Sequence, residues 1–218
     1  MISKIAFIGL GVMGFPMAGH LAAKGYSVTV YNRTSAKAEA WVQAHGGNHA
    51  PTPAAAAKEA DIVFMCVGND NDLQQVSLGA NGALGAMKPG SILVDHTTAS
   101  ADAARKLYAA AKERGVHFLD APVSGGQAGA ESGKLTVMAG GDAAPFDRAK
   151  PVMDCYARAV TLLGPAGAGQ LTKMVNQICI AGMVQALSEG IAFAEKAGLD
   201  PNLVLNVKIG RASCRERV

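Results

Sequence analysis

A glycine-rich hexapeptide near the start of the chain, Gly9-Leu10-Gly11-Val12-Met13-Gly14, is the first segment whose residue types and spacing could do chemistry. It follows an apolar run and opens an amphipathic one. In such a pattern Gly9 permits a tight turn, Gly11 lets the backbone approach a pyrophosphate, and Gly14 lets a helix pack close to the preceding strand. Free N–H groups at the helix start would attract the phosphates. The hexapeptide predicts a dinucleotide-binding turn; the alternative is a glycine-rich turn without a ligand.

The residues expected at the adenosine end of that site are Asn32, Arg33 and Thr34, which follow the second apolar run. Proteins that bind NAD commonly carry an acidic residue there, which holds the ribose hydroxyls. Here Asn32 does not repel a phosphate, Arg33 can form charge-assisted hydrogen bonds, and Thr34 adds a hydroxyl. We therefore expect NADP to be preferred over NAD. The alternative is that Arg33 is a solvated surface residue.

A second polar segment, Ser124-Gly125-Gly126, follows another predicted strand. It offers a hydroxyl and unobstructed backbone N–H groups, a combination that suits a carboxylate. We expect a loop here that could bind a small acid. A plain flexible loop is the alternative, and this segment does not exclude it by itself.

Lys173 is the only charged side chain between Gly164 and Ser188. Asn176 and Gln177 follow it by three and four positions, which places them on the same side of a helix. An ammonium and an amide could therefore converge on one small polar group. The alternative is a surface lysine whose aliphatic stem covers apolar neighbours.

The elements that must position these groups follow from alternating apolar and Ala-rich amphipathic stretches. This alternation predicts repeated βα units, and hence an α/β protein with a doubly wound, mostly parallel sheet of the Rossmann type. We expect strands at residues 4–8, 27–31, 62–67, 91–95, 117–120, 135–139 and 160–163. The expected helices between them are 13–24, 35–44, 52–59, 100–114 and 144–154.

The pattern changes after Gly164-Pro165, because residues 166–197 contain no proline and have apolar positions at helical spacing. They predict one long helix. Asp200 and Pro201 then suit the N-cap and first position of a further helix. We expect a dinucleotide-binding domain over residues 1–165 and the start of an all-helical domain, incomplete in this chain, over residues 166–208.

The last ten residues, 209–218, show no apolar periodicity. With permitted codons they back-translate to a nucleotide string that resembles a common sequencing-adapter read. We therefore expect a non-native tail and a natural chain that continues beyond it. An ordinary basic C-terminal tail is the alternative.

The composition excludes several classes of protein. With 218 residues, 50% hydrophobic and 17% charged, the chain can bury a core and is not a disordered tail. Its net charge of +3 comes from scattered side chains, so we expect no nucleic-acid partner. No membrane span is expected either, because three glycines and a proline interrupt the uncharged stretch at residues 5–23. The four cysteines are Cys66, Cys155, Cys179 and Cys214. They form no CxxC pair, so they indicate neither a metal site nor disulfides. We therefore expect a reducing, cytoplasmic location.

Three motifs, in the same order, resemble the β-hydroxyacid dehydrogenase family over residues 2 to about 207. The first is Gly9-Leu-Gly-Val-Met-Gly-Phe-Pro-Met-Ala18. The second is Asp120-Ala-Pro-Val-Ser-Gly-Gly126, with Gly129-Ala130 and Gly133-Lys-Leu-Thr136 after it. The third is Gly167-Ala-Gly-Gln-Leu-Thr-Lys173-Met-Val-Asn176.

The resemblance implies an NAD(P)-dependent oxidoreductase that transfers hydride between nicotinamide and a small β-hydroxy acid or its semialdehyde, of the 3-hydroxyisobutyrate or tartronate semialdehyde type. It implies that Lys173 donates or accepts the proton and that Asn176 or Gln177 orients the reacting oxygen. Ser124-Gly125-Gly126 would bind the substrate carboxylate. The implied cofactor site comprises Gly9, Leu10, Gly11, Val12, Met13, Gly14, Asn32, Arg33, Thr34, Val67, Gly68 and Thr98.

The sequence departs from the family pattern at one position of the third motif. Many members have Asn-Asn after the lysine, whereas this chain has Asn176-Gln177, so which amide orients the substrate stays open. The family also has an all-helical C-terminal domain that supplies much of the subunit contact, which implies a homodimer or tetramer for the full-length protein. A non-catalytic NADP-binding fragment or regulatory relative is the alternative function. Lys173 argues against a regulator, and also against imine reduction.

Overall fold

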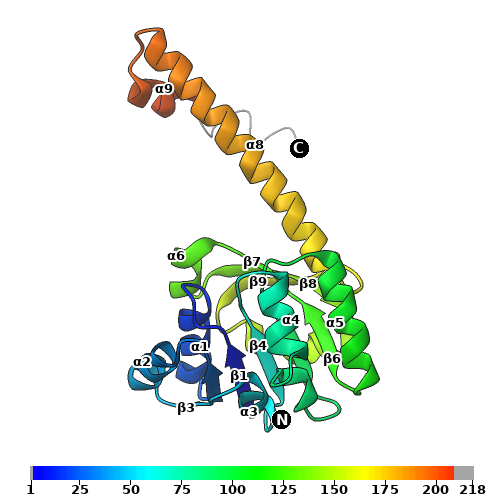
Figure 1. Cartoon of the computed structure of the whole chain (residues 1–218). Helices are drawn as coiled ribbons and strands as arrows, with labels where there is room; N and C mark the ends of the chain where they lie inside the picture. The colour runs from blue at the N-terminus through cyan, green and yellow to red at the C-terminus, as the bar shows by residue number, and fades with distance from the viewer. Residues whose placement is uncertain (1, 209–218) are drawn as a thin grey trace. The chain divides into compact units, whose positions relative to one another are not determined.

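The computed structural model describes residues 2–208 (Figure 1). The chain divides into two compact units, Met1–Lys173 and Met174–Val218, each of which is described by itself. The segment 209–218, for which we expect a non-native origin, lies outside the described residues, and so does Cys214 within it.

The first unit is built on one twisted, mostly parallel sheet. Its strand order is β3-β2-β1-β4-β5-β6-β8-β7, with β9 paired to β8. Only the β6–β8 and β7–β8 pairings are antiparallel. The expected doubly wound Rossmann sheet is therefore confirmed. The strands are β1 (Lys4–Ile8), β2 (Ser27–Tyr31), β3 (Asn48–His49), β4 (Ile62–Met65), β5 (Ile92–Asp95), β6 (His117–Asp120), β7 (Val123–Ser124), β8 (Leu135–Gly141) and β9 (Ala157–Leu162).

Helices cover both faces of this sheet because its central strands are apolar on both faces. In β1, Ile5 and Phe7 belong to the core cluster that α1, α2 and α7 complete, whereas Ala6 and Ile8 belong to the cluster completed by α3, α4 and α5. Figure 1 shows α1 and α2 on one side of the sheet and α4 and α5 on the other. The helices of the first unit are α1 (Gly14–Ala23), α2 (Ser35–His45), α3 (Pro53–Ala57), α4 (Asp70–Leu78), α5 (Ala101–Glu113), α6 (Gly126–Glu131) and α7 (Ala143–Met153).

The structure corrects the expectation of a loop at residues 124–126. Ser124 ends β7, where it pairs with Thr136 of β8, and Gly126 begins α6. Gly125 and Gly126 have φ angles of 127° and 61°, which only glycine adopts readily, so the glycines make a sharp turn between two ordered elements. The prediction also missed β3, α4 and a 3-10 turn at Ala83–Gly85.

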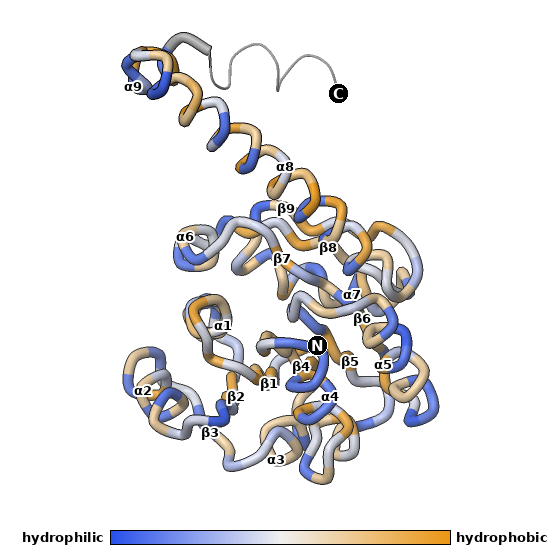
Figure 2. The backbone as a smooth tube through the Cα atoms, turned by 45° about the horizontal axis from the view of Figure 1, so that its top comes forward, coloured by the Kyte–Doolittle hydropathy of each residue, from blue (hydrophilic) through white to orange (hydrophobic). Residues whose placement is uncertain are grey.

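The long helix α8 (Ala168–Lys196) and the short helix α9 (Pro201–Lys208) follow. Asp200 Oδ1 accepts a hydrogen bond from the Asn202 N–H at 2.8 Å, so Asp200 caps α9 as expected. Figure 2 shows hydrophobic positions along much of α8, and Val175, Ile178 and Phe193 are exposed there. Within residues 2–208, α8 is the one helix whose length and composition would allow it to cross a membrane.

Candidate active site

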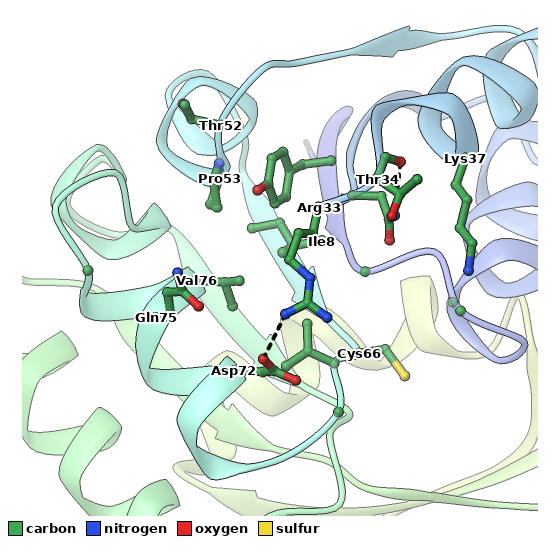
Figure 3. Close-up of a pocket in the computed structure, with 18 of the residues that line it drawn as sticks. Ile8, Arg33, Thr34, Lys37, Thr52, Pro53, Cys66, Asp72, Gln75 and Val76 are labelled. Atoms are coloured by element: carbon green, nitrogen blue, oxygen red, sulfur yellow. Dashed lines mark hydrogen bonds and ion pairs between the residues drawn. The ribbon is translucent and has the colours of Figure 1, made fainter.

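A large pocket of the first unit lies at β1 and β4, where the order of the strands in the sheet reverses. From β1 the chain builds outward to β2 on one side, and β4 lies on the other side, so the carboxyl ends of β1 and β4 flank a crevice. In open α/β sheets this is the place where ligands bind. The pocket has a volume of about 750 Å³ (Figure 3). Its lining includes the predicted cofactor residues Gly9, Gly11, Val12, Met13, Gly14, Asn32, Arg33, Thr34, Val67 and Gly68.

The three glycines of the hexapeptide meet different surroundings. A Cβ at Gly9, whose φ is 98°, would collide with the Cys66 carbonyl group, and a Cβ at Gly14 would collide with the Gly9 carbonyl oxygen. A Cβ at Gly11 would have nothing within 4 Å and would project into open space. Gly9 and Gly14 are therefore required by the protein's own packing, whereas Gly11 leaves room for a ligand. This cradle fits the pyrophosphate of a dinucleotide.

Leu10 has a different role from its neighbours, because it does not line the pocket. Its side chain is buried in the core, and its N–H donates to Asn32 Oδ1 at 3.0 Å. The Asn32 Nδ2 group in turn donates to the Thr34 carbonyl oxygen at 3.0 Å. Asn32 therefore ties the glycine turn to the end of β2.

Cationic and hydroxyl-bearing side chains line the pocket. Arg33 Nη1 lies 3.3 Å from Asp72 Oδ1, and Figure 3 shows Arg33 extended toward Asp72 with Lys37 on another side of the pocket. The sequence reasoning missed Lys37, Thr52 and Asp72 as lining residues. Asp72 could have been found, because Asn69 caps α4 through the Asp72 N–H at 3.0 Å, and a cap residue followed by an acid three positions later is a helix-start pattern.

The loop after β5 carries Thr98, whose side chain is exposed and does not line the pocket. The preceding residue, Thr97, is held on two sides. Its N–H donates to Asp95 Oδ1 at 2.9 Å, and its Oγ1 accepts from the Val67 N–H at 3.1 Å. Thr97 thus joins the segments that follow β4 and β5, which carry Val67 and Thr98.

Lys173 and the Ser124 segment meet in the structure. The Lys173 Nζ atom donates to the Val123 carbonyl oxygen at 2.9 Å, and Ser124 is the next residue of β7. Partial burial lowers the pKa of the Lys173 ammonium below its usual value. Asn176 and Gln177 belong to the second unit, where Asn176 Nδ2 donates to Gln177 Oε1 at 3.1 Å. An amine next to a polar, glycine-rich turn can exchange a proton with a bound oxygen.

His96, which directly follows β5, belongs to a buried polar cluster that the sequence reasoning also missed. His96 Nδ1 lies 2.6 Å from the Ala121 carbonyl oxygen, and His96 Nε2 lies 2.8 Å from the Tyr156 hydroxyl. Because a carbonyl only accepts, Nδ1 carries the proton and Nε2 accepts from Tyr156 in the neutral ring. Burial lowers the pKa of His96 to about 4 and raises the pKa of Asp95 to about 7.

The fold, the glycine cradle and the pocket at the switch point of the sheet are those of a protein that binds a pyridine nucleotide. Residues 4–164 match the family described as the NAD binding domain of 6-phosphogluconate dehydrogenase. Residues 167–215 match the family described as NAD-binding of NADP-dependent 3-hydroxyisobutyrate dehydrogenase. The chain belongs to the β-hydroxyacid dehydrogenase family of oxidoreductases.

Individual relatives agree with this assignment. An uncharacterized oxidoreductase of Shewanella frigidimarina is 64% identical over 94% of this chain and 71% of its own length. The 2-hydroxy-3-oxopropionate reductase of Escherichia coli is 37% identical over 95% of this chain and 70% of its own length. A structure of Mycobacterium tuberculosis 3-hydroxyisobutyrate dehydrogenase with L-serine superposes with a TM-score of 0.87 at 33% identity, covering 97% of this chain and 72% of that one.

Proposed function

We propose that this protein transfers hydride between NADP and a small β-hydroxy acid or its semialdehyde, with Lys173 as the proton donor or acceptor. The substrate would be of the 3-hydroxyisobutyrate or tartronate semialdehyde type, which is the chemistry named for the E. coli and M. tuberculosis relatives. The observation that carries the proposal is the Lys173 Nζ to Val123 oxygen distance of 2.9 Å. It brings the one amine of the third motif to the edge of the second motif.

Of the residues around that contact, some would bind the substrate and one would transfer the proton. Ser124, which is half-buried, and the N–H groups of Gly125 and Gly126 hold the substrate carboxylate. In reduction, the Lys173 ammonium donates its proton to the substrate carbonyl oxygen; in oxidation, the neutral amine accepts the hydroxyl proton. A lowered pKa of Lys173 makes the neutral amine accessible at lower pH. The bound nicotinamide supplies or accepts the hydride.

The preference for NADP is supported by the positive charges that line the pocket. Arg33 and Lys37 line it, and Asn32 replaces the acidic residue that would repel a 2′-phosphate. Arg33 is held by Asp72 at 3.3 Å in the structure, so a phosphate would replace Asp72 as its partner. We expect this exchange to favour NADP over NAD without abolishing NAD binding.

The exposed apolar side of α8 supports a protein partner rather than a lipid one. Polar side chains also lie along the helix. Among them is Gln185, whose Nε2 donates to Glu189 Oε1 at 2.7 Å. A charged and amide-bearing stretch is costly inside a bilayer. We propose that the full-length protein is a cytoplasmic homodimer or tetramer in which other helices cover α8.

The proposed function is tested by a substrate panel with both cofactors. The product of the complete reading frame, recovered from the source locus, is mixed with NADPH or NADH and with tartronate, succinic and methylmalonate semialdehydes and glyoxylate. We expect oxidation of NADPH with at least one of these compounds and a lower kcat/KM with NADH. Binding of NADPH without turnover of any of these carbonyl compounds would favour the non-catalytic alternative.

A further inference from the structure

Gln170, in the first turn of α8, is a buried polar side chain with 1% of its surface exposed. Its Nε2 group donates to the Thr97 carbonyl oxygen at 2.7 Å, and its Oε1 atom accepts from the Ala99 N–H at 3.1 Å. The two hydrogen bonds lie on either side of Thr98, whose own side chain is exposed. One amide therefore fixes the backbone before and after Thr98, a residue of the implied cofactor site.

The side-chain carboxylate of Asp120, the last residue of β6, accepts hydrogen bonds from backbone N–H groups at the start of α8. Its Oδ1 atom accepts from the Gly167 N–H at 2.7 Å, and its Oδ2 atom accepts from the Gln170 N–H at 2.9 Å. The first N–H groups of a helix have no acceptor within the helix. Asp120 supplies acceptors in place of a local cap, and its charge lies at the positive end of the helix dipole.

Two glycines make this contact close. A Cβ on Gly169 would lie 2.9 Å from Asp120 Oδ2, and a Cβ on Gly140 of β8 would lie 2.6 Å from Asp120 Oδ1. Neither separation is tolerated between a methyl carbon and a carboxylate oxygen, so the start of α8 rests directly on the sheet. Lys173 follows Gln170 by three residues, about one helical turn. Any movement of this turn would therefore move the Lys173 amine.

We propose that Gln170 is a positioning residue, which holds the Thr98 loop and the Lys173 amine in one fixed arrangement that Asp120 anchors to the sheet. The inference rests on the proposed function, because it takes Lys173 as the proton donor. Thr97 also has hydrogen bonds to Asp95 and Val67, and neither of them involves Gln170. Loss of the amide is therefore expected to loosen Thr98 and Ala99 while the sheet stays folded.

The variant Gln170→Met, which keeps the length of the side chain and removes both hydrogen bonds, tests the proposal in the product of the complete reading frame. We expect kcat per NADPH-binding site to fall about 10- to 100-fold, because misplaced reactants slow the chemical step. The KM for NADPH should change less than about threefold. The isotope effect with deuterated NADPH should rise, since hydride transfer becomes more limiting. Gln43→Met, at an exposed position of α2, is the matched control.

A purely structural role would reduce the fraction of protein that binds NADPH and would leave the rate per site and the isotope effect unchanged. That result would overturn the proposal. A second measurement does not depend on turnover. The enhancement of NADPH fluorescence on binding should be smaller in Gln170→Met than in Gln43→Met. An equal enhancement in the two variants would also overturn the proposal. Full activity of a Lys173→Ala variant would instead remove the proposed function, so the two failures are distinguishable.

Hydrogen exchange in the unsubstituted protein covers the case in which Gln170→Met does not fold. The N–H groups of Ala99, Gly167 and Gln170 belong to one hydrogen-bonded set. We expect them to exchange through the same opening event, with similar protection. Exchange of the Ala99 N–H about 100-fold faster than the other two would show that the loop and the helix open separately, and would overturn the proposal.

Discussion

The Lys173 amine donates a hydrogen bond to the carbonyl oxygen of Val123, at 2.9 Å, across 50 residues of sequence. Val123 immediately precedes the segment that we expect to bind the substrate carboxylate. The amine thus lies within reach of a small molecule whose acid group is bound at Ser124. The structure thus brings together two motifs that look unrelated along the chain, and under the proposed function they would form one reaction site.

The pH dependence of turnover should follow the ionisation of Lys173. Burial lowers the pKa of its ammonium from the usual 10.5. Reduction needs the charged form, so kcat/KM for reduction should fall as the pH rises through the lowered pKa. Oxidation needs the neutral amine and should rise over the same range. Steady-state assays in both directions measure this, and pH profiles with the same sign in both directions would contradict the assignment.

Gly9 and Gly11 should respond differently to alanine. Gly9→Ala is strained at a φ of 98° and collides with Cys66, so it should lower the free energy of unfolding by about 2 kcal/mol or more. Gly11→Ala meets open space and should change it by less than about 0.5 kcal/mol. It should nevertheless weaken NADPH binding about tenfold or more, because the added methyl group blocks the pyrophosphate. Urea unfolding and fluorescence titration measure both effects; a stable Gly11→Ala variant that binds NADPH normally would refute the pyrophosphate site.

The ion pair between Arg33 and Asp72 should compete with the 2′-phosphate of NADP. Arg33→Ala should weaken NADPH binding about tenfold, the value of a charge-assisted hydrogen bond, with a smaller effect on NADH. Asp72→Asn releases Arg33 and should strengthen NADPH binding about twofold to threefold. Asp102→Asn, which breaks an exposed pair with Arg105, is the matched control. Equal losses for NADPH and NADH in Arg33→Ala would show that Arg33 does not read the phosphate.

The free energy of unfolding should depend on pH through two buried groups, His96 and Asp95, whose effects have opposite signs. His96 has its pKa lowered to about 4, so the unfolded chain binds more protons than the folded one between pH 4 and 6.5. The contribution of neutral His96 is therefore full above pH 6.5 and is lost as the pH falls toward 4. Asp95, with its pKa raised to about 7, acts with the opposite sign: its contribution is full below 3.8 and is lost as the pH rises through 7.

The variant His96→Gln should remove the first contribution alone. Relative to the unsubstituted chain, its free energy of unfolding should change with pH by about 1.4 kcal/mol per unit less between pH 4 and 6.5. Asp95→Asn should shift the slope in the opposite direction. Urea unfolding at several pH values measures the slopes, with the exposed His49→Gln as control. Parallel curves for His96→Gln and His49→Gln would show that His96 is not held neutral.

Most of the sheet could be predicted from the sequence, because its strands are continuous apolar runs that end at turn residues. Helix α4 could not, since only Leu73 and Ser77 of its nine residues are fully buried, so it lacks a clear apolar stripe. The expected strands and helices leave residues 68–90 as one long loop. Structureless loops of that size are uncommon in such folds, which indicates that an element was missed there. Strand β7 has two residues and no pattern of its own.

The sequence predicts candidate site residues where they form local motifs, as they do in the glycine turn and around Lys173. The residues that join those motifs could not be found in this way. Gln170 reads as an ordinary polar helix residue, and only the fold brings its amide to Thr97 and Ala99, more than 70 residues away in sequence. His96 likewise gains its neutral state from burial beside Phe64 and Tyr156, which no local pattern indicates.

The most direct test of the central claim is the turnover of Lys173→Ala beside that of Lys112→Ala, an exposed lysine of α5, with NADPH and the best semialdehyde of the panel. Loss of a general acid should lower kcat about 100- to 10,000-fold, while the Kd for NADPH stays within about threefold of the unsubstituted value. Lys112→Ala should match the unsubstituted protein in both. A Lys173→Ala variant with kcat within about twofold of the Lys112→Ala control would contradict the assignment of Lys173 as the proton donor.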